Sequence, residues 1–160
     1  MSQENTALVK ADEKAVRYIP FGGKDQIELS IGMVKKFLAT PTKSGKIPDD
    51  REIVKFMMLC QARELNPWEG DAHLVGYDTQ NGPKFSMVTA HQSFLKRAEA
   101  CMEFDGMESG SIVKNQSGGI EEVIGDFIYP GFTLIGGWAK VYRKDRKFPM
   151  VSRLNLGVYD

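Results

Sequence analysis

The sequence predicts an α+β fold, in which N-terminal helices, a β-hairpin and one further helix precede a small antiparallel sheet. Two observations support this prediction. Apolar residues recur at the helical period in several segments of the first hundred residues. From residue 107 onward, glycine, β-branched and aromatic residues dominate, as is typical of strands and turns. Helices that come first and strands that come later are the order expected of an α+β protein.

The polar, weakly patterned residues 1–26 are expected to form a flexible N-terminal segment. The first helix is predicted over 29–40, with one apolar face and a stop before the loop that follows. The second helix is predicted over 50–64 and opens with a capping box, Asp49 followed by Glu52. Its predicted buried face consists of Ile53, Phe56, Met57 and Cys60.

The second helix is expected to end at Asn66-Pro67, because proline cannot continue the hydrogen-bond ladder. Trp68 follows at this corner. We expect its indole to pack against the apolar face of the preceding helix, because a tryptophan at such a corner is more often a packing residue than a binding surface. Asn66, Pro67 and Trp68 therefore mark a structural corner. The turn that continues it, Glu69-Gly70-Asp71, is acidic.

A hairpin is predicted next, with strands over 72–77 and 84–89 joined through Asn81-Gly82, since both turn residues tolerate positive φ. The third helix is predicted over 90–103, opening with Thr89 and Gln92 as a capping box. Its predicted buried stripe is Phe94, Leu95, Ala98, Cys101 and Met102. Four strands complete the chain, at 109–114, 120–128, 134–143 and 149–154.

The charges balance in number but not in position. Among 160 residues, 21 basic and 21 acidic side chains give no net charge, which argues mildly against a dedicated nucleic-acid binder. Residues 99–126, however, carry seven acids and one lysine, and residues 140–153 carry six bases and one acid. Because electrostatic potential is screened within about 8–10 Å, this local asymmetry is more informative than the total.

Composition also bears on the cellular compartment. Cys60 and Cys101 both fall in apolar helical patterns, which indicates reduced, buried thiols. The N-terminus lacks the basic-then-apolar layout of a signal peptide, and no apolar run approaches the roughly 18–20 residues of a membrane span. We therefore expect a cytoplasmic protein without a membrane partner.

Catalytic and metal-binding patterns are weak. The residues His73, His91, Cys60 and Cys101 match no zinc spacing. No serine-nucleophile motif and no complete P-loop is present, so neither acyl transfer nor ATP use is indicated. A metal-dependent nuclease centre built from Glu69, Asp71 and Asp126 remains the alternative enzyme hypothesis, although acids at turns are commonplace.

The segment "GWAKVYRKDRKF" (137–148) carries the clearest binding pattern. Strand alternation places Trp138, Lys140 and Tyr142 on one face, with Lys144 beyond them. Cations interleaved with aromatic rings suit single-stranded nucleic acid, because the cations neutralise phosphates and any base offers a face for stacking. An exposed hairpin tip with solvated charges and core aromatics is an equally open interpretation.

A second candidate site is the start of the third helix. Its N–H groups and dipole could receive a phosphate, with Lys84, His91 and Arg97 close in the sequence. An ordinary helix start without a ligand is the favoured alternative.

Taken together, these segments resemble the Bet (Red-beta) branch of the RecT-like phage single-strand annealing proteins. The resemblance spans about residues 50–155 and includes the helix that follows Thr89. The motifs "NPW", "FDGM" and "YRKDR" are specific for the family when they occur in this order, whereas any one of them alone is a weak signal. The matching stretches are "LNPWEGDAHLVGY" (65–77), "TQNG" (79–82), "FDGMES" (104–109) and "VYRKDRKFP" (141–149).

The resemblance implies ATP-independent binding and annealing of single-stranded DNA by a homo-oligomeric ring or filament, without catalytic residues. It implies a bacterial host cell, a phage exonuclease as a partner, and no cofactor, with Mg²⁺ only as a counterion for DNA. By this resemblance, the leading candidates for contacts with the DNA backbone are Lys144 and its neighbours Arg143, Arg146 and Lys147. The full set of expected DNA-binding residues adds Lys140, Tyr142, Arg153, Lys84, His91 and Arg97.

Two departures from the family pattern are visible. Where the family usually has a lysine or another polar residue after the tryptophan, this chain has the acidic turn that follows Trp68. A contact with the DNA backbone is therefore not expected at this turn. Relatives also continue beyond the basic segment into a further basic stretch and a long helix. We therefore expect residues 27–160 to be an annealing core that is incomplete at its C-terminus, or else a truncated interaction domain without DNA activity.

Overall fold

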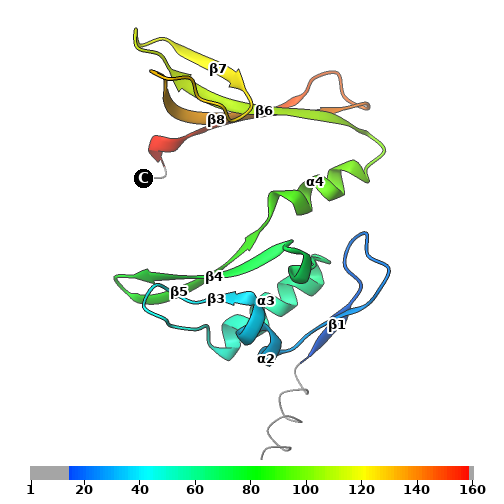
Figure 1. The fold of residues 1–160 in the computed structure, drawn as a ribbon. Helices are drawn as coiled ribbons and strands as arrows, with labels where there is room; N and C mark the ends of the chain where they lie inside the picture. Colours follow the sequence, from blue (N-terminus) through cyan, green and yellow to red (C-terminus); the bar gives the residue numbers. More distant parts are fainter. Residues whose placement is uncertain (1–14, 159–160) are drawn as a thin grey trace, which may run out of the picture. The chain divides into compact units, whose positions relative to one another are not determined.

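A computed structural model describes residues 15–158, and the chain divides after Arg97 into two units (Figure 1). Unit 1 contains the residues up to Arg97, and unit 2 begins at Ala98. Helices dominate the earlier part, and a four-stranded antiparallel sheet dominates the later part, which confirms the predicted α+β fold. None of the helices formed by residues 15–158 has the length and apolar content that a bilayer crossing requires.

Unit 1 is built from short strands and helices around α3. Strands β1 and β2 form an antiparallel pair, and β3, β4 and β5 form a three-stranded sheet in that order. The elements are β1 (Val16–Tyr18), β2 (Ile27–Leu29), α2 (Ile31–Met33), η1 (Val34–Leu38), β3 (Ala39–Thr40), α3 (Asp50–Ala62), η2 (Pro67–Glu69), β4 (Ala72–Thr79) and β5 (Gly82–Thr89). Helix α4 (His91–Glu99) follows, and the division between the units falls within its last turn.

Helix α3 provides most of the core of unit 1. Its capping box is present, because the Asp49 carboxylate accepts from the Glu52 N–H at 2.8 Å and the Glu52 carboxylate accepts from the Asp49 N–H at 3.1 Å. The predicted face of α3 is buried, and it packs in one apolar cluster with residues of β1, β2, η1 and β4. The cluster consists of Tyr18, Leu29, Val34, Ile53, Phe56, Met57, Cys60, Leu65, Ala72 and Leu74.

Burial also controls the chemistry of the core thiol. Cys60 is fully buried, and loss of hydration raises its pKa to about 12. The thiol is therefore protonated at physiological pH and acts as a small apolar side chain.

The first predicted helix is shorter than expected, and its second part is wound more widely than an α-helix. The α-helical part covers α2 alone, where the Ser30 hydroxyl caps the N–H of Met33. The chain then forms the π-helical turn η1, and the N–H of Ala39 bonds to the carbonyl of Val34 as the chain enters β3. The parallel pairing of β3 with β4 ends the helix here, which the local apolar pattern could not indicate.

The β4–β5 hairpin is confirmed, but its turn lies one residue earlier than predicted. Thr79 pairs with Gly82, so Gln80 and Asn81 form the two-residue loop. Gly82 takes the positive φ of 105°, a conformation that glycine adopts without steric cost. Asn81 needs no positive φ because Gly82 supplies it.

The N-terminal segment differs from the prediction where it is described. Residues 1–14 lie outside the described residues, so flexibility remains a prediction for them. Residues 16–18 form β1 and pair with β2. The Tyr18 ring is buried and its hydroxyl donates to the Leu65 carbonyl, so this part of the segment belongs to the core.

Helix α4 covers a shorter range than the predicted 90–103 and exposes a different face. Phe94 and Met102, expected in the core, are 62% and 84% exposed, whereas Ser93 is buried. The N–H of Ala90 is held by the Asp71 carbonyl at 2.9 Å, which fixes the start of the helix and thereby its rotation. The periodicity gave the helix but not its orientation.

Unit 2 is a single antiparallel sheet in the order β7-β6-β8-β9. Its strands confirm the four predicted ones with shifted ends: β6 (Phe104–Lys114), β7 (Ile120–Ile124), β8 (Thr133–Arg143) and β9 (Met150–Asn155), followed by η3 (Leu156–Val158). Arg153 on β9 pairs with Glu122 on β7 at 2.6 Å. Because two strands lie between β7 and β9, this pair requires a strongly curved sheet.

We predict that Phe56→Ala lowers the free energy of unfolding by about 3–5 kcal/mol, because it leaves a cavity at the centre of unit 1. Met58→Ala on the same helix is the control, since Met58 is 53% exposed and its loss should cost less than about 1 kcal/mol. Urea unfolding followed by circular dichroism measures both values. Equal losses would show that α3 does not pack as described.

Candidate functional site

The basic turn, residues 143–148, joins β8 to β9 and is ordered by its own side chains. Arg143 donates two hydrogen bonds of 2.8 Å to the Asp145 carboxylate, and the N–H of Arg146 bonds to the Arg143 carbonyl at 3.2 Å. These bonds to Arg143 hold the pKa of Asp145 below its usual value and raise that of Arg143. Arg143 is therefore already paired with an anion inside the turn.

The start of β6 braces the basic turn from the neighbouring strand. Phe104 pairs with Arg143, the N–H of Lys144 bonds to the Glu103 carbonyl at 2.8 Å, and the Lys144 ammonium reaches the Met102 carbonyl at 3.3 Å. The sequence stretches "FDGM" and "YRKDR", about forty residues apart, thus meet in one sheet.

A bulge sets the register of this brace. The β6–β8 pairing shifts between Phe104 and Met107, where Gly106 has a φ of 101°. A residue with a side chain is strained at this φ, so glycine is required to aim the start of β6 at the turn. This requirement gives the glycine of "FDGM" a structural role.

The cations of the segment differ in how strongly they are neutralised. Arg153 is paired with Glu122, and Arg143 with Asp145. Lys144 contacts an uncharged carbonyl and keeps its net charge available. Arg146 and Lys147 are exposed at the tip, with Lys147 lying 5.5 Å from the centre of the exposed Phe148 ring. The turn therefore offers three cations and one aromatic face to an anionic ligand.

The predicted strip along β8 is only partly available. Trp138 and Lys140 share a face as predicted, and the Lys140 ammonium lies 4.9 Å from the indole. Trp138 is nevertheless buried, and its Nε1–H donates to the Val123 carbonyl at 3.3 Å. Tyr142 donates to Glu108 at 2.9 Å, and this bond raises its pKa. For Trp138 the structure favours the interpretation as a packing residue, whereas the Tyr142 hydroxyl is engaged by Glu108 at the surface.

The second candidate site, at the start of α4, is dispersed. His91 is exposed at the first turn, but Arg97 lies six residues later, about 9 Å along the axis. The Arg97 guanidinium donates to the Arg63 carbonyl and stacks 4.4 Å from the Phe21 ring centre. Lys84 lies on β5, where it lines a groove against α3. Arg97 and Lys84 thus make their contacts elsewhere and do not join His91 in one phosphate site at the helix start.

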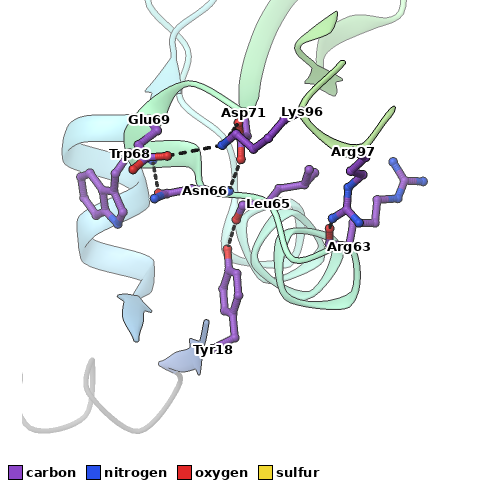
Figure 2. A network of polar contacts seen from close by, with 9 residues as sticks. All are labelled: Tyr18, Arg63, Leu65, Asn66, Trp68, Glu69, Asp71, Lys96 and Arg97. Carbon is purple, nitrogen blue, oxygen red and sulfur yellow. Dashed lines mark hydrogen bonds and ion pairs between the residues drawn. The ribbon is translucent and has the colours of Figure 1, made fainter. Parts of the chain in front are cut away.

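The corner after α3 is a closed polar network, shown in Figure 2. Asn66 accepts from the N–H of Trp68 at 3.1 Å, and the buried Asp71 carboxylate accepts from the N–H of Asn66 at 2.9 Å. Lys96, from α4, reaches both Asp71 at 3.4 Å and Glu69 at 3.5 Å. The acidic turn is thus neutralised from within unit 1, which agrees with a structural role.

Trp68 does not pack as predicted. Its indole is 44% exposed, and Figure 2 shows it directed away from the network. Its ring partner is Phe37 of η1, with centroids 6.4 Å apart, rather than the apolar face of α3. The reason is the short η2 turn at Pro67, which points residue 68 toward η1.

Two of the three residues of the nuclease hypothesis, Glu69 and Asp71, serve the corner, whereas Asp126 belongs to unit 2. Glu69 and Asp71 share Lys96, and a lysine between two carboxylates occupies the position a cation would take. Among residues 15–158, no group of three or more histidine, cysteine, aspartate or glutamate side chains is placed to hold a metal ion.

Sequence reasoning missed two positioning residues, Lys96 and Glu103. Lys96 holds α4 to the corner, and the Glu103 carbonyl holds the basic turn. The Cys101 thiol donates to the Glu103 carboxylate at 3.1 Å and holds the pKa of that group below its usual value. The acidic turn at 69–71 was a signal that a cation should lie nearby.

We predict that Asp71→Ala lowers the free energy of unfolding by about 1–3 kcal/mol, because it leaves the buried N–H of Asn66 without a partner. Glu69→Ala, which removes only an exposed ion pair to the same lysine, should cost less than about 1 kcal/mol. Thermal and urea unfolding measure the difference. A corner that tolerates both changes equally would contradict the role given to Asp71.

Comparison with known proteins agrees with the motif geometry. The family model described as the RecT family matches residues 28–157, which include the corner, the hairpin, the start of β6 and the basic turn. No curated protein matches the chain significantly. Because the family match covers most of the sequence, the chain belongs to the RecT family.

Proposed function

We propose that this protein binds single-stranded DNA and promotes ATP-independent annealing of complementary strands in phage-type homologous recombination. Membership of the RecT family supports a role in recombination. The single observation that carries the finer proposal is the braced basic turn, where Lys144, Arg146 and Lys147 stand on a turn held by the start of β6.

The arrangement suits the phosphate backbone of a flexible strand. A turn fixed by hydrogen bonds presents its cations without first losing backbone entropy, so less free energy is lost when a strand binds. Each phosphate neutralised releases condensed counterions, which favours association at low salt. The exposed Phe148 beside Lys147 adds a surface on which any base can stack.

Annealing on this account needs no bond-breaking residue and no cofactor. Cations reduce the repulsion between two strands, and binding along the backbone leaves base edges available for pairing. Mg²⁺ acts only as a counterion for DNA. The nuclease alternative is not favoured by the corner, where Lys96 neutralises Glu69 and Asp71.

A homo-oligomer would extend this surface along the DNA. We propose a ring or filament in which the acidic region of one subunit, residues 99–126, faces the basic turn of the next. The sheet of unit 2 has β7 and β9 as its edges, and β7 carries the exposed Glu121 beside Glu122, which is paired with Arg153 of the same chain. High salt should then weaken both DNA binding and assembly. A phage exonuclease and the cytoplasm of a bacterial host complete the proposed context.

We predict that Arg146→Glu combined with Lys147→Glu weakens binding to an oligothymidylate by roughly tenfold or more and lowers the salt slope of the affinity by about two, because two phosphate contacts are lost. Fluorescence anisotropy at several salt concentrations measures both quantities.

The matched control is Lys24→Glu combined with Lys46→Glu, which makes the same charge change at two exposed lysines of unit 1. This control should change the affinity only slightly. If both double variants bind like the parent chain, the basic turn is not the DNA site. If both lose affinity equally, only net charge matters and the site assignment is wrong.

A further inference from the structure

A groove on unit 1 lies between α3 and the edge strand β5, away from the basic turn in the sequence. Its volume is about 400 Å³, within the range of roughly 300–1,000 Å³ that is typical of ligand pockets. Its walls come from α3, β4 and β5, and the lining residues are Glu52, Lys55, Phe56, Leu59, Arg63, Leu74, Lys84, Phe85, Ser86 and Met87.

The charges of the groove come from two opposing walls. Lys55 lies on α3, and Arg63 is the residue that caps the C-terminal end of this helix. They are eight positions apart with Leu59 midway, so the helical period places all three along one side of the helix. Lys84 lies opposite on β5. The acid of the groove, Glu52, has its carboxylate tied to the N–H of Asp49 at the start of α3. Three cations therefore share the groove with one acid at the helix start.

The apolar part of the groove includes an aromatic ring held in place by a glycine. Phe85 pairs with Gly76 across the hairpin, and a Cβ on Gly76 would meet the Phe85 ring at 2.6 Å and the backbone of Thr42 at 2.8 Å. Only glycine fits this close approach. The half-buried Phe85 ring therefore lies over Gly76 of β4, and it lines the groove together with Leu59 and the buried Leu74.

The edge of the sheet adds hydrogen-bonding groups. In the described part of the chain, no strand pairs with the outer side of β5, so backbone groups there are open to a ligand. Cations on two walls, an aromatic face between them and open backbone groups form the combination that a phosphate and a base require together.

We propose that the groove between α3 and β5 binds a short stretch of single-stranded DNA, with its phosphates at Lys55, Arg63 and Lys84 and one base against Leu59 and Phe85. The choice of ligand rests on the proposed function, but the site is separate from the basic turn. Each subunit then holds DNA at two places, one in each unit, so that one strand or two can be captured by the same chain.

The test is photo-crosslinking of the whole chain to an oligothymidylate that carries 4-thiothymidine, with the adducts mapped by mass spectrometry. We expect adducts on the peptide that contains Lys84 to Met87 as well as on the peptide of the basic turn. In Lys55→Glu combined with Lys84→Glu, the groove adducts should fall about tenfold, through loss of two phosphate contacts, while the turn adducts persist.

Lys24→Glu combined with Lys46→Glu is the charge-matched control and should retain both sets of adducts. Phe85→Leu, which preserves an apolar side chain at the core edge, should reduce the groove adducts without unfolding the chain, as judged by circular dichroism.

Each outcome decides between the two proposals. Adducts on the basic turn alone, or groove adducts that persist in the Lys55 and Lys84 double variant, overturn the groove and leave the proposed function standing. Groove adducts without turn adducts support the groove and overturn the assignment of the turn. A chain that forms no adducts at either place overturns both.

Discussion

The pairing between the start of β6 and the end of β8 is the contact on which the functional account depends. It joins Phe104 to Arg143 and holds the backbone of Lys144 through the Glu103 carbonyl. Without it, the run of five charged residues that starts at Arg143, four of them basic, would fray through mutual repulsion of its cations. With it, an internal Arg143–Asp145 pair becomes the rigid base from which Arg146 and Lys147 extend. The geometry explains why "FDGM" and "YRKDR" occur in the same chain.

In unit 1, as in the basic turn, some cations are paired within the fold and others are open to a ligand. Some cations are used structurally: Lys96 neutralises the buried Asp71, and Arg97 holds a backbone carbonyl beside Phe21. Others, such as Lys55 and Lys84, line a groove where the acid lies at one end. A chain with no net charge can therefore still present local positive potential, because its acids are placed against particular bases or gathered in a separate segment.

Local signals predicted the elements well. The helical period and capping box gave α3, and the Asn-Gly turn gave the hairpin to within one residue. The features that local sequence signals did not predict depend on contacts between residues that are far apart in the chain. The rotation of α4 is fixed by Asp71, and the direction of Trp68 by the η2 turn, so neither follows from periodicity. Strand alternation placed Trp138 and Lys140 on one face correctly, but it could not show that the indole is covered. Which arginine is already paired is decided by strand register, as the Arg153–Glu122 pair illustrates.

Annealing by this protein can be measured with two complementary oligonucleotides, each carrying one dye of a fluorescence energy-transfer pair, mixed with the whole chain in EDTA and without ATP. We expect the protein to accelerate the rise in energy transfer over the protein-free rate, the strands to stay intact, and added salt to suppress the acceleration. Annealing at the protein-free rate, or acceleration that requires ATP, would contradict the proposed function.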